Sequence, residues 1–485
     1  MIRSFEAILG DLLIGHRGFL GDGATGRVQN DSRKVLPGDI FVAIPGTKLD
    51  GGDFIESALQ AAAKVIIHEK PLDHYRRGVA YLMVTSARKA YARCCREFYE
   101  RPDEVLRLFG VTGTNGKSTT ALLVEHLLRH GGVPCGLIST VEYRDGKLVR
   151  PASQTTPEAG VLFPLLAEMR RNGQKAVAME LSSHALAQDR ISGARFRTGI
   201  FTNLSGDHLD YHRDMEHYYQ AKKSFFTEYL DSGSTAVINV DDPWGARLAG
   251  ELSGMRVITF GTVPGSMWRI GNVKLDAAGS RFRLSCPERA FDVAIGLIGM
   301  HNVYNLAGAL LAVLDFGLSP AAIDEALSFP VRVPGRLESF RRADGAVFYV
   351  DYAHTDDALA NVLTILRRIC TGRLIAVFGA GGDRDRAKRP RMGKAAGEIA
   401  DLLIVTSDNP RSEDPEAIIS EIVAGVPEGR PFEMVTDRAA AIRRAAELAG
   451  PGDVVLVAGK GHENYQEIAG VRRPFDDRAV VKSLL

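Results

Sequence analysis

Short apolar segments recur along this chain, and many of them end in a run of glycine or polar residues. The segments alternate with stretches long enough for helices, an order that predicts α/β layers built on parallel strands. Ligands of open α/β sheets bind beyond the carboxyl ends of the strands, so the polar runs mark candidate sites. The apolar segments and the runs that follow them are 105–109 with 112–118, 176–179 with Glu180, 198–201 with 203–212, 347–350 with Asp351, 374–378 with 379–385, 402–405 with 407–411, and 454–457 with 459–463.

The chain is too long for a single hydrophobic core. Its 485 residues suggest about three domains, because cores stop growing near about 250–300 residues. The apolar pattern breaks at 101–103 and again at 330–334, where prolines cluster. We therefore expect an α/β chain with a small N-terminal domain over 1–100, a central domain with a mostly parallel sheet over 101–331, and a C-terminal Rossmann-like domain over 332–485.

Charge and cysteine content exclude several classes of function. Lys and Arg number 60 against 59 Asp and Glu, for a net charge of +1, which argues against a nucleic-acid-binding protein. No apolar run is long enough to span a membrane, and Glu6 and Asp11 make the N-terminal segment a poor signal peptide. The five cysteines form no CxxC pair, which is typical of a reduced chain. We expect a cytoplasmic protein, monomeric, acting on small molecules.

The glycine-rich run 110–119 predicts a phosphate-binding loop, and with it a P-loop-type ATPase fold for the central domain. Backbone N–H groups of such a loop surround phosphate oxygens, Lys117 reaches the outer phosphates, and the Ser118 hydroxyl can bind Mg²⁺. The strict G-x-x-x-x-G-K-[ST] pattern fails by one place, because its first glycine is Gly110. A plain glycine turn between a strand and a helix is the alternative.

Two further acidic or histidine-rich positions are candidate metal ligands. Glu180 ends an apolar strand, where a carboxylate can hold Mg²⁺ directly or through water, although a surface acid is equally typical there. The run 207–212 is dense in Asp and His, but lacks further ligands at zinc spacing. A Mg²⁺ or phosphate role fits better beside a phosphate loop, and a solvated polar loop remains the alternative.

Several motifs, in the same order along the whole chain, resemble the Mur ligase family. These are ATP-dependent amide ligases that build the peptide stem of peptidoglycan. The branch that adds meso-diaminopimelate to UDP-N-acetylmuramoyl-L-alanyl-D-glutamate is the most similar. The motifs are 113–117, 203–210, 301–305, 334–336 and 351–354 for the family, and 30–35, 37–39, 50–51, 155–157, 180–184 and 408–411 for the branch.

The resemblance implies a role for each matching residue, with ATP and Mg²⁺ as cofactors and an acyl phosphate as intermediate. The N-terminal domain would bind the UDP-sugar, the central domain ATP and Mg²⁺, and the C-terminal domain the amino acid. Lys222, by itself an ordinary exposed helix lysine, matches a lysine that CO₂ carbamylates.

The implied catalytic residues are Lys117, Glu180, His208 and Lys222, and the implied metal ligands are Ser118, Glu180, His208 and Lys222. The implied ATP contacts are Gly113, Thr114, Asn115, Gly116, Lys117, Ser118, Thr119, Asn302, Arg336 and Asp351. The implied UDP-sugar-peptide contacts are Ser32, Thr155, Thr156, Ser182, Gln188 and Arg190, and the implied diaminopimelate contacts are Arg384, Asp408, Asn409, Arg411, Gly459 and Glu463.

The diaminopimelate pocket also has a physical rationale. This amino acid carries a second ammonium–carboxylate end that lysine lacks, so its pocket needs a planar cation and an anion. Arg384 and Arg411 are candidates for the first, and Asp408 and Glu463 for the second. The rest of the basic run 384–394 would be a solvated loop.

Three other functions remain open. Folylpolyglutamate synthase shares the fold and the chemistry, but should lack the N-terminal domain and the 408–411 motif. A dinucleotide-dependent oxidoreductase is suggested by 379–382, although Arg384 stands where G-x-G-x-x-G needs its third glycine. A non-catalytic nucleotide-binding scaffold is the third, and the presence of Lys117, Glu180 and His208 argues against it.

Overall fold

A computed structural model describes residues 4–18, 26–46, 49–206, 209–276 and 279–485. Internal contacts divide the chain into two units. The first comprises Met1–Gly271, Arg283–Asp292 and Tyr304–Phe329, and the second comprises Asn272–Phe282, Val293–Val303 and Pro330–Leu485. Each unit is described by itself.

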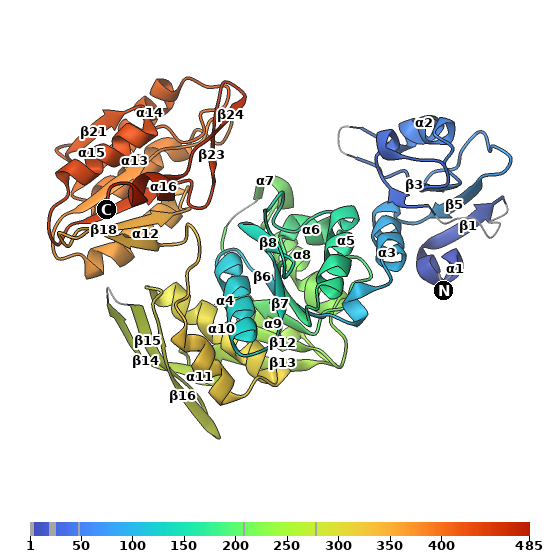
Figure 1. Cartoon of the computed structure of the whole chain (residues 1–485), viewed down its shortest axis with the longest axis horizontal. Coiled ribbons are helices and arrows are strands. Elements are labelled where there is room, and N and C mark those ends of the chain that lie inside the picture. Colours follow the sequence, from blue (N-terminus) through green and yellow to red (C-terminus); the bar gives the residue numbers. More distant parts are fainter. Residues whose placement is uncertain (1–3, 19–25, 47–48, 207–208, 277–278) are drawn as a thin grey trace. The chain divides into compact units, whose positions relative to one another are not determined.

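The N-terminal part of the first unit is a 5-stranded sheet of order β1-β5-β4-β3-β2, drawn in blue in Figure 1. Strands β2 to β5 pair in parallel, and β1 lies antiparallel to β5. The strands are β1 (Leu13–Arg17), β2 (Val28–Gln29), β3 (Ile40–Val42), β4 (Val65–His68) and β5 (Ala80–Val84), and the helices are α1 (Phe5–Leu9), α2 (Ile55–Gln60) and α3 (Ala87–Phe98), with a 3-10 turn η2 at Ser32–Lys34.

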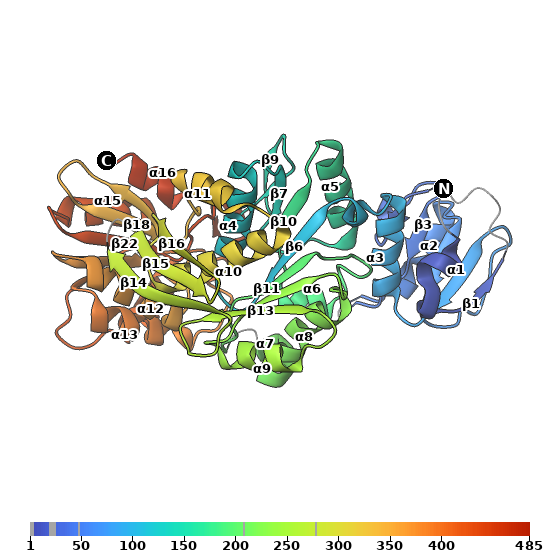
Figure 2. The same cartoon turned by 90° about the horizontal axis from the view of Figure 1, so that it is seen from below.

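The central sheet is 11-stranded, with the order β16-β15-β14-β13-β12-β11-β6-β10-β7-β8-β9. Its strands from β13 to β7 are parallel, whereas β8 and β9 continue it antiparallel. Figure 2 shows β14, β15 and β16 side by side at the other end. The strands are β6 (Arg107–Thr112), β7 (Cys135–Ile138), β8 (Glu142–Arg144), β9 (Val149–Pro151), β10 (Ala176–Glu180), β11 (Thr198–Phe201), β12 (Thr235–Asn239), β13 (Arg256–Gly261), β14 (Trp268–Asp276), β15 (Gly279–Cys286) and β16 (Arg289–Ile295).

Strand β6 lies at the topological switch point of this sheet. Its neighbours in the sheet are β10 and β11. Strands β10 and β7 lie on one side of β6, and β11, β12 and β13 lie on the other, so the strand order changes direction at β6. A crevice opens at the carboxyl end of such a strand, and ligands bind there. The helices of this region are α4 (Lys117–His130), α5 (Ala159–Arg171), α6 (Ser183–Ala187), α7 (Leu209–His212), α8 (Met215–Glu228), α9 (Pro243–Glu251), α10 (Met300–Phe316) and α11 (Pro320–Ser328).

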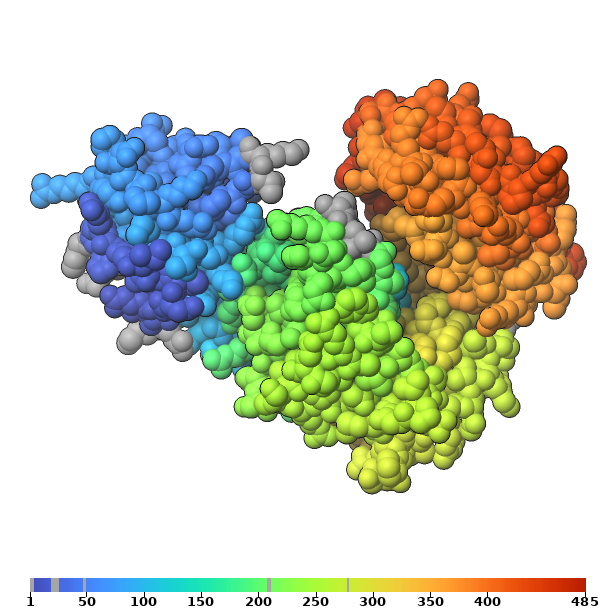
Figure 3. All heavy atoms as spheres, turned by 180° about the vertical axis from the view of Figure 1, so that it is seen from behind, coloured from blue at the N-terminus to red at the C-terminus, as the bar shows by residue number. Residues whose placement is uncertain are grey.

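The C-terminal sheet is 6-stranded, with the order β17-β18-β22-β19-β20-β21, and only β17 is antiparallel. Figure 3 shows this part as one rounded mass in orange to red. The elements are β17 (Glu338–Arg341), β18 (Val347–Asp351), β19 (Leu374–Phe378), β20 (Leu402–Thr406), β21 (Phe432–Val435), β22 (Val454–Ala458), a separate hairpin of β23 (Tyr465–Ile468) and β24 (Val471–Pro474), and α12 (Asp356–Ile369), α13 (Lys388–Ile399), α14 (Pro415–Val423), α15 (Arg438–Leu448) and α16 (Asp477–Lys482).

Alternation of side chains explains how the C-terminal strands bury both faces. Leu374, Ala376 and Phe378 belong to a core that also holds apolar residues of α12, α13 and α14. Ile375 and Val377 belong to a second core with residues of α15 and α16. Successive residues of a strand point to opposite faces, so a continuous apolar strand is the sequence pattern of a sheet covered on both sides.

The expected fold class is confirmed. Thr198–Phe201 and Leu374–Phe378 have the predicted bounds. The strand expected at 105–109 lies at Arg107–Thr112, and the strands expected at 176–179, 347–350, 402–405 and 454–457 each extend one residue further. Sequence analysis missed β1, β2, β7, β8, β9, β16, β17, β21, β23 and β24. Among the described residues, no helix has the length and apolar character needed to cross a membrane.

Candidate active site

The glycine-rich loop joins β6 to α4 at the switch point, and the segment after β11 holds it in place. The Thr114 N–H donates to the Asn203 carbonyl (2.8 Å), and the Asn115 N–H donates to Asn203 Oδ1 (2.9 Å). The Thr202 hydroxyl donates to the Asn115 carbonyl (2.6 Å). The first N–H groups of α4 have no partner within the helix, and together with the helix dipole they favour an anion such as a phosphate.

Lys117 is the first residue of α4, and its ammonium group lies over the loop. Its Nζ donates to the carbonyls of Gly113 (3.0 Å) and Thr114 (2.6 Å). Ser118 and Thr119 are the next residues of the helix and are both buried. The loop therefore offers backbone donors, a cation and a hydroxyl within one turn, and these are the groups that bind the phosphates and Mg²⁺ of a nucleoside triphosphate.

Lys222 is buried, so the interpretation of its sequence context as an exposed helix lysine is wrong. Only 1% of its surface is exposed, and its Nζ donates to the Gly113 carbonyl (2.7 Å). The same ammonium lies 4.5 Å from the ring centroid of Tyr218, whose hydroxyl is 3.2 Å from Thr114 Oγ1. Helix α8 thus brings both side chains against the phosphate loop, and the resemblance identified a lysine that does lie at this loop.

Glu180 ends β10, directly beside the strand that leads into the loop. It is paired in register with Val111 of β6, and its side chain is fully buried. The carboxylate accepts hydrogen bonds from the Thr140 N–H (2.7 Å) and the Thr140 hydroxyl (3.1 Å). The interpretation as a surface acid is therefore wrong. Both donors are neutral, and a buried carboxylate is costly without a cation, so this position suits a metal ion.

The oxygen atoms of Ser118 and Glu180 are the hard ligands that Mg²⁺ prefers. Among residues outside the gaps 207–208 and 277–278, no three His, Cys, Asp or Glu side chains are grouped as a ready-made metal cage. His208, the third expected ligand, lies outside the described residues.

The residues expected at the sugar-peptide substrate gather around Arg190. Its guanidinium donates to the Thr156 carbonyl (2.8 Å) and to Gln188 Oε1 (2.8 Å). The Thr156 hydroxyl in turn donates to the Glu180 carbonyl (2.8 Å) and accepts from the Ser182 N–H (3.0 Å). Thr155 joins the same group, because its hydroxyl oxygen lies 3.0 Å from that of Thr140. Ser32 lies apart from them in sequence, in the turn η2 of the N-terminal sheet.

Three expected nucleotide contacts belong to the second unit. Arg336 lies 4.7 Å from the Tyr352 ring centroid, and Asp351 ends β18. The Asp351 carboxylate accepts from the N–H groups of Leu337 (2.7 Å) and Ala353 (2.8 Å). Burial raises the pKa of Asp351, and the nearby positive charge of Arg336 opposes this rise. Asn302 lies at the start of α10 and donates to the Ile298 carbonyl (2.9 Å).

The expected amino-acid contacts form one cluster at the carboxyl ends of β20 and β22. Asn409 Nδ2 donates to Glu463 Oε2 (2.9 Å), and Asp408 is nearly as buried as Asn409. A Cβ atom at Gly459 would lie 2.4 Å from Asp408 Oδ2, so a side chain there would displace that carboxylate. The structure thus brings together Asp408, Asn409, Gly459 and Glu463.

The two arginine candidates flank the glycine loop after β19. Arg411 donates from Nη1 to the Gly382 carbonyl, and a Cβ atom at Gly381 would lie 3.1 Å from Arg411 Nη1 and 3.9 Å from Arg384 Cγ. A Cβ atom at Gly382 would lie 1.9 Å from the Pro410 carbonyl oxygen. The glycines of this run therefore permit a close approach to the 408–411 motif, which accounts for them without a dinucleotide.

The basic run 384–394 is not simply a solvated loop. It runs into α13, and Arg389 is fully buried. The Arg389 guanidinium pairs with Glu413 (2.8 Å) and Glu421 (2.8 Å). This ion-pair cluster anchors the loop that carries Arg384 to α14.

Sequence analysis missed several side chains that organise these clusters. Thr140 and Tyr218 carry no motif signal. Asn203 stands in one of the quoted motifs without a role, and Lys460 stands between two expected contacts. Lys460 is fully buried and donates to Asn409 Oδ1 (3.0 Å) and Glu463 Oε2 (3.0 Å).

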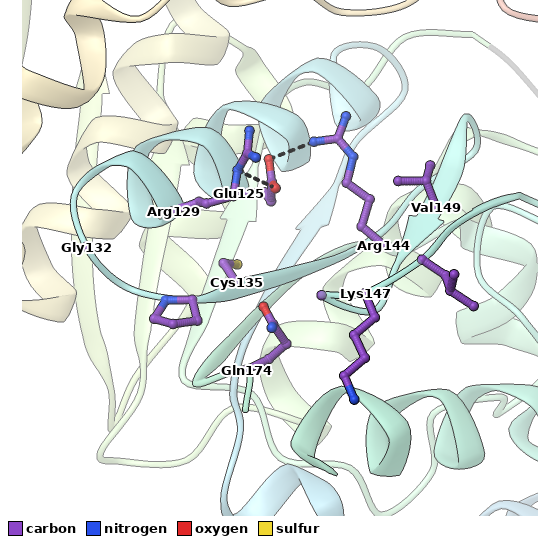
Figure 4. Close-up of a pocket in the computed structure, with 11 residues that line it drawn as sticks. Glu125, Arg129, Gly132, Cys135, Arg144, Lys147, Val149 and Gln174 are labelled. Carbon is purple, nitrogen blue, oxygen red and sulfur yellow. Dashed lines mark hydrogen bonds and ion pairs between the residues drawn. The ribbon is translucent and has the colours of Figure 1, made fainter. Parts of the chain in front are cut away.

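A separate cavity of about 370 Å³ lies at the other end of α4 (Figure 4). Glu125 bridges Arg129 (3.1 Å) and Arg144 (3.0 Å) on its wall. Burial raises the pKa of Glu125, and the two arginines oppose this rise. Glu125, which lines this cavity, lies eight residues along α4 from Lys117, or about 12 Å at 1.5 Å per residue. The lining of the cavity is therefore not part of the candidate active site.

Comparison with known proteins covers nearly the whole chain. Family models match as the Mur ligase family, catalytic domain (residues 26–99), the Mur ligase middle domain (111–313), and the Mur ligase, glutamate ligase domain (335–461). UDP-N-acetylmuramoyl-L-alanyl-D-glutamate--2,6-diaminopimelate ligase of Geobacter metallireducens is 44% identical, over 93% of this chain and 92% of the relative. The protein of the same name from Aquifex aeolicus is 43% identical, over 94% and 92%.

A solved structure of a ligase with that name has a TM-score of 0.71 at 35% identity, and covers 100% of this chain and 99% of its own. The likeness therefore extends through the N-terminal, middle and C-terminal domains alike. Sequence motifs, sheet order and full-length relatives agree that this chain belongs to the Mur ligase family.

Proposed function

We propose that this enzyme is an ATP-dependent ligase that joins meso-diaminopimelate to UDP-N-acetylmuramoyl-L-alanyl-D-glutamate. The observation that carries the proposal is a pair of sites built at the carboxyl edges of two sheets. One has a phosphate loop with Glu180 beside it, and the other clusters Asn409, Glu463 and Arg411. Relatives that span more than nine-tenths of the chain carry the name of this reaction.

ATP binding is assigned to the phosphate loop. The backbone of 113–119 and the Lys117 ammonium hold the phosphates, and Asn302, Arg336 and Asp351 are proposed to contact the rest of the nucleotide. Ser118, Glu180 and His208 are the proposed Mg²⁺ ligands. The ion, when bound, neutralises charge on the phosphate oxygens during transfer.

The reaction proceeds in two steps. A carboxylate oxygen of the glutamyl residue attacks the γ-phosphorus of ATP, and the bond to the bridging oxygen of ADP breaks, giving an acyl phosphate. The neutral amine of diaminopimelate then attacks the acyl carbon, and the tetrahedral intermediate expels phosphate while the nitrogen loses its proton. Thr155, Thr156, Ser182, Gln188 and Arg190 hold the peptide end, so that positioning supplies much of the rate.

Lys222 is the proposed carbamylation site. A neutral Lys222 amine adds to CO₂ and loses a proton, which turns a cation into an anion. Because Lys222 Nζ lies 2.7 Å from the Gly113 carbonyl, the carbamate would lie beside the phosphate loop. A second divalent cation would fit there, since it would compensate the buried negative charge.

The amino-acid end has the charges that diaminopimelate requires. Arg411 and Arg384 are proposed to bind its distal carboxylate, for which a guanidinium is the matching fork. Glu463 and Asp408 are proposed to accept from its distal ammonium. Residues 332–485 would form this domain, and 101–331 the ATP domain.

The N-terminal domain, over 1–100 with Ser32, is proposed to bind the uridine nucleotide. Because ATP and a UDP-linked sugar are both cytoplasmic metabolites, we place the reaction in the cytoplasm, with the protein acting as a monomer.

Phosphate release tests the proposal. The purified protein is mixed with ATP, Mg²⁺ and UDP-N-acetylmuramoyl-L-alanyl-D-glutamate, and then with meso-diaminopimelate or L-lysine. We expect release with diaminopimelate and at least about 100-fold slower release with lysine. Release with lysine alone would overturn the pocket assignment, whereas release only with a folate and glutamate would overturn the substrate assignment.

A further inference from the structure

Lys460 is a buried cation to which the expected ligand contacts assign no role. It follows β22, between Gly459 and Gly461, and its side chain is fully buried. Its ammonium lies 3.0 Å from Asn409 Oδ1, 3.0 Å from Glu463 Oε2 and 5.3 Å from the Tyr465 ring centroid. Removing an ammonium from water is unfavourable unless it is paired and hydrogen-bonded. A lysine placed here therefore requires both of these acceptors.

The ammonium also determines the orientation of the Asn409 amide. Asn409 Oδ1 accepts from Lys460 and from the Glu467 N–H (2.9 Å), while Nδ2 donates to Glu463 Oε2. With two donors on its oxygen and an acceptor on its nitrogen, the amide has one satisfied orientation. The loop after β20 is thereby tied to the loop after β22.

Glu463 is held on one side only. Lys460 and Asn409 both contact Oε2, and no described residue donates a hydrogen bond to Oε1. About one-fifth of the Glu463 side chain is exposed, whereas that of Lys460 is fully buried. The carboxylate is thus anchored through one oxygen, which leaves the other able to accept from an incoming group.

We propose that Lys460 is a positioning residue that fixes Glu463 and Asn409 for the distal ammonium of the incoming diamino acid. This inference rests on the proposed function. Without the ammonium, Glu463 keeps one protein hydrogen bond and can rotate, and Asn409 loses one of the two donors that fix its amide. Binding of the amino acid weakens, while binding of ATP and of the UDP-substrate stays as it was.

Steady-state kinetics of Lys460→Met and Lys460→Arg test the proposal. We expect Lys460→Met to raise the KM for diaminopimelate about 10-fold or more, with the KM values for ATP and the UDP-substrate within about 2-fold of wild type. Lys460→Arg keeps a cation, and its KM should lie closer to wild type. Arg373→Met is the control. It breaks the ion pair between Arg373 and Asp453, which directly precede β19 and β22, so it perturbs the same sheet at the edge opposite the amino-acid cluster.

A double-mutant cycle with Glu463→Gln separates positioning from general loss of structure. If Lys460 acts through Glu463, Lys460→Met should change the KM by less than about 3-fold in the Glu463→Gln background. Fully multiplicative effects, or an equal rise in the KM for ATP, would overturn the proposal. If Lys460→Met does not fold, the same cycle is run with Lys460→Gln. Failure of the wild type to use diaminopimelate would instead refute the proposed function.

Discussion

At the scale of single residues, Arg411 shows how a strained backbone can support a binding side chain. Its φ is 53°, in the left-handed region that non-glycine residues seldom adopt. The Arg411 N–H donates to the Glu467 carbonyl (3.0 Å), and its own carbonyl accepts from the Ala469 N–H (2.7 Å). These bonds hold the strained conformation and direct the guanidinium to the loop at Gly381. Strain retained in this way is typical of ligand-binding positions.

We predict that Arg411→Ala raises the KM for diaminopimelate about 100-fold, or about 2.7 kcal/mol. The loss reflects the charge-assisted hydrogen bonds to the distal carboxylate. The KM for ATP should stay within about 2-fold. Arg411→Lys is the matched variant, since it keeps the charge but not the planar fork, and should give an intermediate KM. Equal increases for both substrates would show that Arg411 does not bind the amino acid.

The neighbouring lysines 222 and 223 provide a second comparison. Lys222 is buried at the Gly113 carbonyl, whereas Lys223 pairs with Glu251 (2.9 Å) on a more exposed face of α8. We expect Lys222→Met to lower kcat about 1000-fold and Lys223→Met to leave it within about 3-fold. Wild-type activity should fall in CO₂-depleted buffer and return with bicarbonate. Activity that is insensitive to bicarbonate would refute carbamylation.

Burial of single charged residues could not be predicted from the local sequence. Lys222 and Arg389 both occur in polar helical surroundings, and their burial depends on groups distant in the chain. The acceptor of Lys222 lies 109 residues away, at Gly113. The partners of Arg389, which are Glu413 and Glu421, follow β20 in the chain, whereas Arg389 precedes it. The resemblance located Lys222, but not Arg389.

At the scale of elements, helix α4 is flanked by two glycines with similar backbone angles. Gly116 has φ of 85° and Gly132 has φ of 88°. A Cβ atom at Gly116 would lie 2.3 Å from Asn305 Oδ1, which also accepts from the Thr120 hydroxyl (3.3 Å). At Gly132 no atom of the described residues lies within 4 Å of such a Cβ. Alanine therefore brings the same backbone cost to both positions, but a collision only to Gly116.

We predict that Gly132→Ala costs about 1 kcal/mol of unfolding free energy and leaves the kinetics unchanged. Gly116→Ala should also lower kcat/KM for ATP about 100-fold, because the loop must shift away from Asn305. Urea unfolding and initial rates measure the two effects. Similar kinetics for both variants would show that the loop tolerates displacement.

His126 makes the packing of α4 on α11 dependent on pH. Burial lowers the pKa of His126 to about 4, and its Nε2 donates to the Ala326 carbonyl (2.9 Å). In the unfolded chain the imidazole titrates near 6.5. Below pH 6.5 the folded state therefore binds fewer protons than the unfolded chain. The contribution of His126 to the free energy of unfolding is fully present above about pH 6.5 and is lost toward pH 4.

We expect this loss to reach about 3 kcal/mol at pH 4. His126→Gln keeps a donor for the Ala326 carbonyl and does not titrate. Urea midpoints between pH 7 and 4 should fall less steeply for this variant than for wild type. Parallel curves would show that His126 is not responsible.

Long buried strands were predictable, and short edge strands were not. The residues of β11 and β19 are buried without exception, and their continuous apolar runs predicted both strands. Strand β9 has only three residues, and β21 alternates between exposed and half-buried positions. Such strands depend on the neighbouring strand rather than on their own composition.

At the scale of the whole molecule, the candidate residues lie at the carboxyl edges of parallel sheets. This placement was predictable, because polar runs after parallel strands must share one edge. Which side chains touch was not predictable. Thr140 precedes β8, far from Glu180 in sequence, yet supplies both hydrogen bonds to its carboxylate. Lys460 likewise links motifs that the sequence separates by about fifty residues.

Isotope transfer tests most directly whether ATP activates the glutamyl carboxylate. UDP-N-acetylmuramoyl-L-alanyl-D-glutamate is prepared with ¹⁸O in that carboxylate and turned over with ATP, Mg²⁺ and meso-diaminopimelate. Mass spectrometry then compares the released phosphate with the amide product. An acyl phosphate predicts one ¹⁸O in each phosphate released, with the amide product formed in equal amount. Unlabelled phosphate would mean that water attacks ATP, and would contradict the proposed ligase mechanism.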